Sequence, residues 1–224
     1  MSPSDSNPLD DLPEDVHLAF RTAGWIPGQR RRGAKQDWWK EFSRALRVKL
    51  FGIRSRSDLS EEHLRKGEEN FQEFPAAKHI LDEMLGLTVE PLSKTGDSCP
   101  SPVIFDPSGG YAYYDEIYRL MEIVHSDLVP VGELMSLATI LLARTGHVFL
   151  HGTTGPGILL AGNSFGEAMS RILHGQRKRP IYFTESENPE REFQLSHLDE
   201  NDPWVLRVRD VINIKGKVIT MPQR

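Results

Sequence analysis

The sequence predicts an α+β protein in which helices come first, an antiparallel-rich sheet follows, and one more helix closes the domain. Before residue 87, apolar residues recur at helical spacing in two segments that each end at a glycine. Between residues 128 and 162, short apolar runs alternate with turn residues, which is typical of strands joined by hairpins. The chain of 224 residues is 38% hydrophobic and 26% charged, so it can bury one sizeable core.

The first helix is expected to begin at Leu12. Residues 1–11 before it are rich in Ser, Pro, Asp and Asn, and we expect them to form a disordered leader. The apolar residues of the helix fall on one stripe: Leu12, Val16, Ala19, Phe20 and Ala23. Gly24 ends the helix, and the turn at Pro27-Gly28 folds Trp25 back onto it.

A second helix is expected from about Ala34, with apolar side chains on one side and basic side chains on the other. After it, the chain is interpreted as carrying an inserted, polar helical segment near residues 47–74. Pro75 suits the first turn of a further helix, which Gly86 ends as a left-handed carboxyl cap. The residues expected to face inward from it are Ala76, Ala77, Ile80, Leu81 and Met84.

Strands are expected to dominate after residue 86. Their predicted ranges are 87–92, 103–105, 128–134, 138–143, 147–151 and 157–160. Pro102 and Pro107 flank the second of these, which favours an edge or terminal position in the sheet. A helix over 114–126 separates the second strand from the third, and the tight turn 144–146 joins the fourth to the fifth.

The closing helix is predicted over 165–174, because Ser164 and Glu167 have the spacing of a capping box. Residues 176–224 then form an extension that we expect to be rich in β-structure. Its strands are predicted at 204–208 and 211–221, with a hairpin turn at 215–216. The sequence leaves open whether these strands join the main sheet or form a small subdomain.

The sequence predicts a cytoplasmic protein. No apolar run approaches the roughly 20 residues that span a bilayer, and the first residues lack the basic and apolar regions of a secretory signal. The single cysteine, Cys99, cannot form an internal disulfide. A reactive thiol is the less favoured interpretation of Cys99, because exposure alone does not convert a thiol to a thiolate.

No catalytic or metal-binding constellation emerges, and we expect no enzyme activity, metal or cofactor. His147 and His151 lie about 13 Å apart on one strand, too far to bind one zinc ion, so ordinary strand residues are the better interpretation. The glycine-rich run 151–157 lacks the ending of a P-loop and is interpreted as a turn. Ser164 stands between two glycines at the spacing of a nucleophile elbow, but its capping role already accounts for it.

The net charge of −5 hides a strong asymmetry. From Gly28 to Arg56 there are ten basic and two acidic residues, a balance of +8 that leaves −13 for the rest of the chain. The basic surface expected from this stretch includes Arg30, Arg31, Arg32, Arg44 and Arg47. Arginines interleaved with aromatic residues can contact phosphates and stack on bases, so nucleic-acid binding is one interpretation. The simpler one is a solvated helix face, and a docking surface for an acidic protein is a third.

Four segments occur in a fixed order along the chain. They are Ala23-Gly24-Trp25-Ile26-Pro27-Gly28, Leu85-Gly86-Leu87-Thr88-Val89-Glu90-Pro91, Phe105-Asp106-Pro107, and Pro130-Val131-Gly132-Glu133-Leu134 before the hairpin at Thr145-Gly146. Over roughly residues 12–175, this order resembles the third family of the SUKH superfamily, bacterial proteins mostly known as immunity partners of secreted toxins. The resemblance implies helices packed on a curved, mainly antiparallel mixed sheet. The insertion near 47–74 and the extension after Gly175 depart from the family pattern.

The resemblance implies a nonenzymatic protein that binds a cognate toxin domain, of nuclease or deaminase type, and occludes its active site. The acidity outside the basic stretch suits a basic toxin. Matching residues that look architectural are Gly24, Trp25, Pro27, Gly28, Gly86, Pro91, Pro130 and Gly132. The acidic residues expected to contact the partner are Glu90, Asp106, Asp115 and Glu133. A nucleic-acid-binding or regulatory scaffold using residues 30–56 is the alternative function, and the sequence does not set the oligomeric state.

Overall fold

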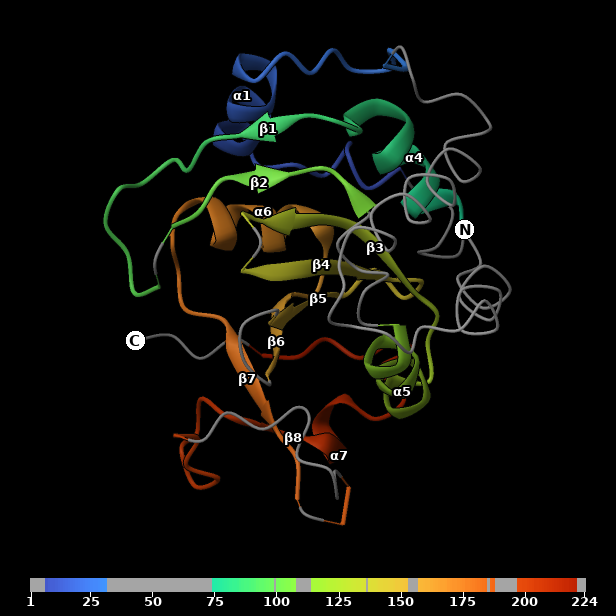
Figure 1. Ribbon diagram of the computed structural model, residues 1–224, viewed down its shortest axis with the longest axis vertical. Coiled ribbons are helices and arrows are strands. Elements are labelled where there is room, and N and C mark those ends of the chain that lie inside the picture. The colour runs from blue at the N-terminus through green and yellow to red at the C-terminus, as the bar shows by residue number, and fades with distance from the viewer. Residues whose placement is uncertain are drawn as a thin grey trace, which may run out of the picture.

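The computed structural model describes residues 7–31, 74–98, 100–107, 114–135, 137–152, 157–184, 186–187 and 197–220 (Figure 1). The helix predicted from Ala34 lies outside these residues. So does the insertion predicted near 47–74, apart from its last residue.

Eight strands follow one another across the sheet in chain order. They are β1 (Thr88–Val89), β2 (Val103–Ile104), β3 (Leu128–Leu134), β4 (Ala138–Ala143), β5 (Val148–Gly152), β6 (Ile158–Gly162), β7 (Arg179–Tyr182) and β8 (Leu206–Arg207). Neighbouring strands are antiparallel except β7 and β8, which are parallel. The predicted α+β class, with a mainly antiparallel mixed sheet, is confirmed.

The position of β2 differs from the prediction. We expected an edge strand, but β2 lies between β1 and β3, and β1 forms the edge. Pro102 and Pro107 fall outside the two residues of the strand, so neither removes a hydrogen bond from the ladder. Gly132 of β3 allows the close approach of β2, because a Cβ atom there would lie 2.6 Å from the carbonyl oxygen of Ile104.

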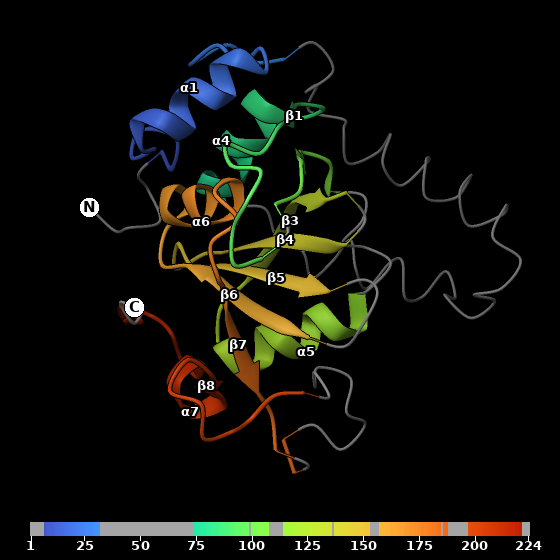
Figure 2. The same cartoon turned by 90° about the vertical axis from the view of Figure 1, so that its left-hand side faces the viewer.

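The described helices divide between the two faces of the sheet (Figures 1 and 2). They are α1 (Glu14–Thr22), α4 (Pro75–Met84), α5 (Tyr114–Val124), α6 (Phe165–Leu173) and α7 (Val208–Val211). Helices α1, α4 and α6 belong to the apolar cluster on what we call the first face, whereas α5 and α7 belong to the cluster on the second face. Alternation along β4 separates the clusters, since Ile140 and Leu142 face the first and Leu141 faces the second. Among the described residues, no helix has the length and apolar character that crossing a bilayer requires.

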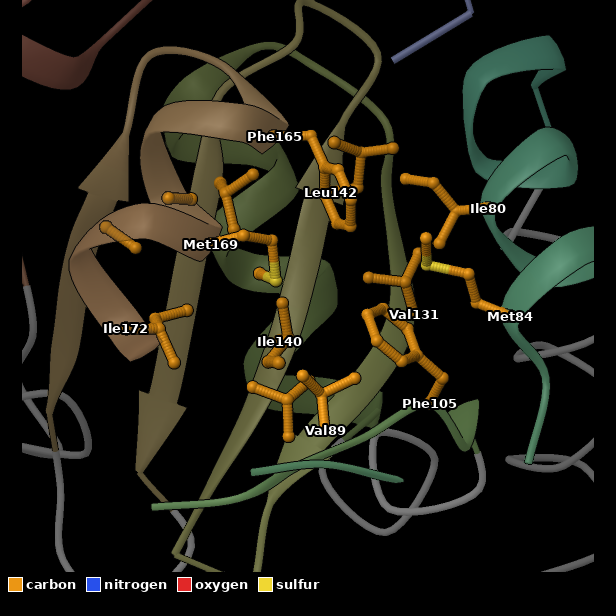
Figure 3. Packing of buried hydrophobic residues seen from close by; sticks show 14 of the residues in the cluster. Ile80, Met84, Val89, Phe105, Val131, Ile140, Leu142, Phe165, Met169 and Ile172 are labelled. Atoms are coloured by element: carbon orange, nitrogen blue, oxygen red, sulfur yellow. The ribbon is translucent and has the colours of Figure 1, made fainter. Parts of the chain in front are cut away.

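Aromatic and aliphatic side chains fill the first face (Figure 3). Phe105 is fully buried, and its ring centroid lies 5.7 Å from that of Phe20 on α1 and 6.3 Å from that of Phe165 on α6. Edge-on and tilted contacts at these distances are favourable for aromatic rings. One residue after β2 therefore joins two helices that lie far apart in the sequence.

The turn over residues 25–28, which follows α1, is hydrogen-bonded to α4. Gly24 has a φ of 95°, a left-handed conformation that lets the chain leave α1 sharply. The Trp25 indole Nε1 and the Gly28 backbone N–H both donate to Oε2 of Glu83, each at 3.0 Å. The two hydrogen bonds are a physical basis for the architectural role expected of Trp25 and Gly28, and the left-handed backbone is one for Gly24. Of the residues expected to form the leader, 1–6 lie outside the described residues, whereas 7–11 form turns and Leu9 is buried in the first-face cluster.

The extension completes the second face. Its residues in the second-face cluster are Ile181, Phe183, Leu206, Val208, Val211, Ile214 and Ile219. They pack with α5 and with the sheet side chains Phe149 and Leu160. Because β7 pairs with β6, the extension joins the main sheet.

The extension contains less β-structure than predicted, and the strand expected over 211–221 is wrong. The Asp210 carboxylate accepts the Arg207 backbone N–H at 2.8 Å, and this cap starts α7 instead. Beyond α7 the chain continues in turns, one of which is closed by a 3.0 Å hydrogen bond from the Lys217 N–H to the Ile214 carbonyl. The hairpin expected at 215–216 is therefore a turn without flanking strands.

Arg179, at the start of β7, ties the later residues of the extension to the sheet with three hydrogen bonds. Its guanidinium donates to the backbone carbonyls of Trp204 at 2.9 Å, Pro203 at 3.0 Å and Thr220 at 2.6 Å. Burial lowers the pKa of this arginine, while the nearby carboxylates of Asp210 and Asp202 act in the opposite direction. The last described turn is also tied to the sheet, because the Asn163 side chain exchanges two hydrogen bonds with the Ile219 backbone.

Candidate partner-binding surface

The strand register lines up five side chains in a row across the second face. Thr88 pairs with Ile104, Ile104 with Glu133, Glu133 with Thr139, and Thr139 with His151. Residues paired in this way point to the same face of a sheet. Exposure falls along the row: Thr88 is exposed, Ile104 and Glu133 are half-buried, and the last two are buried. A partner can therefore reach the row only at the end formed by β1, β2 and β3.

Helix α5 brings a carboxylate to the buried end of the row. Glu116 Oε2 lies 2.7 Å from His151 Nε2, with the glutamate side chain 34% exposed and the histidine side chain 2% exposed. Thr139 beside them completes the residue types of a nucleophilic triad, but its side chain is 0% exposed, so no substrate reaches the hydroxyl. Glu116, Thr139 and His151 therefore form a structural contact between α5 and the sheet.

The turn between β3 and β4 carries two large apolar side chains into solvent. Met135 is 55% exposed and Leu137 is 48% exposed. The Leu137 N–H donates to the Leu134 carbonyl at 2.7 Å, which closes the turn tightly. Met135 has a φ of 36°, the left-handed region that glycine, asparagine and aspartate usually occupy.

Glu90 lies at the same end of the sheet as this turn. Val89 pairs with Val103, and Val103 pairs with Leu134, so the residues that follow Val89 and Leu134 leave the sheet side by side, two strand spacings or about 10 Å apart. Glu90 is exposed there. We call Glu90, Glu133, Met135 and Leu137 the hairpin-end surface. It combines two carboxylates with two apolar side chains.

The structure places two of the four acidic residues predicted for partner binding beside the β3–β4 turn. Glu90 and Glu133 belong to the hairpin-end surface. Asp106 is exposed but follows β2 at its other end, four residues or about 13 Å beyond the position opposite Glu90. By the same register it lies two residues along and one strand across from Glu133, or about 8 Å away. Asp115 belongs to α5, and its side chain lies outside the described set. Met135 and Leu137 were not predicted, although apolar residues in a turn position were the signal that could have identified them.

The basic surface predicted for residues 30–56 is described only at its beginning. Arg30 Nε lies 3.3 Å from Asp82 Oδ2 on α4, and its side chain is 73% exposed. The Arg31 backbone N–H donates to the Asp82 carbonyl at 3.1 Å. An exposed ion pair of this kind contributes at most about 1 kcal/mol, so it orients the chain more than it stabilises it. Arg32, Arg44 and Arg47 lie outside the described residues, and nucleic-acid binding through this stretch stays a prediction.

Ser164, which was weighed as a nucleophile, has a structural role, whereas residues 153–156 of the glycine-rich run lie outside the described residues. Ser164 Oγ accepts the Glu167 backbone N–H at 3.2 Å and so caps α6. The Glu167 carboxylate reaches back to the Asn163 N–H at 2.9 Å, one residue earlier than in a regular capping box. Within the described ranges, no group of three His, Cys, Asp or Glu side chains could hold a metal ion.

His147, just before β5, links the sheet to the extension. The Lys217 carbonyl can only accept, so His147 Nε2 carries the proton in the 2.9 Å contact between them. His147 Nδ1 then accepts from the Thr145 hydroxyl at 3.0 Å. Burial lowers the pKa of His147, against smaller opposing effects of the Lys217 carbonyl and Glu167. The neutral imidazole is therefore a fixed part of the scaffold.

A groove of about 590 Å³ lies between the end of α5, the β4–β5 turn and the turn at Lys215-Gly216. Its charged lining residues include Glu122, Asp127, Arg144 and Lys215. Arg144 Nε lies 2.6 Å from Asp127 Oδ2, so opposite charges are already paired within the groove. The hairpin-end surface, in contrast, presents charge of one sign.

Comparison with protein families identifies one match. The family described as SUKH-3 immunity protein matches residues 12–175, well over half of the chain. The matched range contains α1, α4, α5, α6 and strands β1 to β6, and it ends where the extension begins. No curated protein and no solved structure matches the chain.

Proposed function

The chain belongs to the SUKH-3 immunity protein family, and from this premise we propose that it binds a cognate bacterial toxin domain in the cytoplasm and neutralises it by occluding the active site. The family membership suggests immunity against a toxin. The mode of neutralisation, the toxin class and the contact residues belong to the proposal. No bond is made or broken, because the inhibitor works by the fit of its surface.

The observation that carries the proposal is the gathering of Glu90 and Glu133 on the hairpin-end surface. Enzymes that act on nucleic acids hold the phosphate backbone with lysine and arginine side chains. A carboxylate-bearing surface competes for these side chains and speeds encounter by electrostatic steering. We therefore propose a nuclease or deaminase-type toxin whose basic substrate cleft is covered by this end of the sheet.

The size of a stable interface sets how far the contact extends. Tight complexes bury about 800 Å² on each partner, more than four side chains provide. The exposed Thr88 and half-buried Ile104 continue the surface along β1 and β2 on the second face. We place the hairpin-end surface at the centre of the interface and these strands at its rim.

Co-expression tests the proposal. The chain is produced together with the toxin domain encoded by the neighbouring gene, growth is followed, and affinity is measured with a catalytically inactive form of that toxin. We expect wild-type protein to restore growth, and Glu90→Lys and Glu133→Lys, each made singly, to slow association at least about tenfold at low salt, because charge complementarity acts mainly on the association rate.

Glu14→Lys is the matched control, since it makes the same charge change as either single substitution on α1, which covers the first face, and should leave association near the wild-type rate. Failure of the wild-type chain to bind this toxin or to restore growth would contradict the proposal. Equal effects of all three substitutions would argue for a general charge effect and against this surface.

A further inference from the structure

Met135 occupies a backbone conformation that its side chain disfavours. Its φ of 36° lies in the left-handed region, which is strained for a residue with a Cβ atom relative to glycine. Asparagine, aspartate or glycine is the usual solution in a tight hairpin turn. With 55% of its surface exposed, Met135 recovers little of this cost by burial within the chain. A strained and exposed apolar residue indicates a role outside folding.

Leu137 strengthens this indication. It is 48% exposed and lies across the same turn. Other exposed large apolar residues, such as Leu18 on α1 and Val218 in the extension, are single residues on separate elements. In the part of the chain that the structure describes, only the β3–β4 turn carries two such side chains within three positions. Scattered single apolar residues are normal on a surface, whereas paired ones mark contact sites.

We propose that Met135 and Leu137 are the apolar anchors of the toxin interface, inserting into an apolar socket of the toxin that is rimmed by lysine or arginine side chains. The inference rests on the proposed function and names the contact that holds the complex together. Binding energy in protein interfaces concentrates in a few central, desolvated side chains within a polar rim. Methionine suits the role because its flexible thioether adapts to the shape of a socket.

The charges beside the turn determine the kind of partner. Glu133 directly precedes Leu134 in the hairpin, Glu90 leaves the sheet beside it, and the hairpin-end surface contains no basic side chain. Two carboxylates repel a nucleic-acid backbone and an anionic lipid surface alike. They also oppose a second copy of the same surface. A basic protein surface is the complementary partner.

The test separates the role of Met135 in binding from its effect on folding. Met135→Gly removes the anchor and at the same time relieves the left-handed backbone. We expect the urea midpoint of unfolding to stay the same or to rise, while affinity for the inactive toxin encoded by the neighbouring gene falls at least about tenfold, chiefly through faster dissociation. Leu137→Ser should weaken affinity by a similar factor. The controls Leu18→Ser and Val218→Ser remove exposed apolar side chains elsewhere and should bind as the wild type does.

The outcomes distinguish this inference from the proposed function. If the wild-type chain binds the toxin and both hairpin variants bind it equally well, the anchors are refuted while the proposed function stands. If Met135→Gly lowers stability along with affinity, the side chain is a folding determinant and the inference is overturned. Loss of a wild-type dimer in sedimentation of Met135→Gly would assign the turn to self-association and would also overturn it. If the wild-type chain does not bind the toxin, both proposals fail.

Discussion

The two faces of the sheet are covered by different parts of the chain. On the first face, α1, α4 and α6 all come from the segment that matches the family, and so do the strands beneath them. On the second face, among the described residues, the same segment provides α5, and the extension after Gly175 supplies the other residues of the cover. The comparison shows that the boundary of a family match is not the boundary of the hydrophobic core.

The faces also differ in how their cover is attached. The turn after α1 is held to α4 through one buried carboxylate, that of Glu83. The extension enters the sheet through the pairing of β7 with β6, and its later residues are tied back through their backbone carbonyls by Arg179 on β7 and by the His147 imidazole.

Removing the extension should have the largest effect, because the second face loses the residues that cover it. A chain ending at Gly175 loses seven buried apolar residues from the second-face cluster, each worth about 1.5–3 kcal/mol. Their sum reaches the whole stability of a typical domain, about 5–15 kcal/mol. We expect the shortened chain to aggregate or to bind a hydrophobic dye without a cooperative urea transition. A shortened chain that unfolds cooperatively with near wild-type stability would show that the first face suffices.

A smaller change tests how the later residues of the extension are tied to β7. Arg179→Met removes three charged hydrogen bonds to carbonyls, and we expect the free energy of unfolding to fall by about 3 kcal/mol, some of the loss being offset by water. Arg177→Met is the matched control. Its guanidinium is exposed, lies 3.3 Å from Asp202 and stacks on Trp204, so we expect a loss of about 1 kcal/mol or less. Equal losses in urea unfolding would mean that the guanidinium of Arg179 is not a specific clamp.

The smallest expected effect is the pH dependence of stability that Lys178 of the extension causes. Lys178 donates to Ser98 Oγ at 2.7 Å, and burial, with a smaller contribution from Arg171, lowers its pKa to about 8. The unfolded chain keeps the ordinary value of about 10.5, so between these pH values it binds more protons than the folded chain does. The stability contribution of Lys178 therefore rises as pH increases from about 8 to 10.5.

Lys178→Met should remove this rise. We expect the stability difference between wild type and variant to change by about 2 kcal/mol in favour of the wild type from pH 7 to pH 10, measured by urea unfolding at each pH. Parallel stability profiles of the two proteins would show that the lysine is solvated in the folded chain.

Local signals allowed much of the first face to be predicted from the sequence. Helix α4 begins at Pro75 and is followed by Gly86 at a φ of 75°, as the proline and glycine indicated. Helix α6 has the predicted serine cap. Each of these signals lies within a few residues of the feature it predicts, so no knowledge of the tertiary fold was needed.

The second face was harder to predict, because its determinants are distant in sequence. Val208 and Val211 fit either a strand or a short helix, and the Asp210 cap favours the helix. Of the candidate site residues, Glu90 and Glu133 come together only through the pairing of β1, β2 and β3, which the sequence did not specify. The same register places Asp106 away from Glu90 and from the β3–β4 turn.

The order of strands in the sheet has a consequence for biosynthesis. Each strand pairs with the strand made just before it, so the sheet can grow as the chain leaves the ribosome. At ~5–20 residues per second, the extension follows the matched segment by roughly 2 to 10 s. During that interval Phe149 and Leu160 lack their final neighbours, so the second face of the sheet would be exposed to chaperones. The time needed to translate the extension thus sets how soon the second-face cluster can be completed.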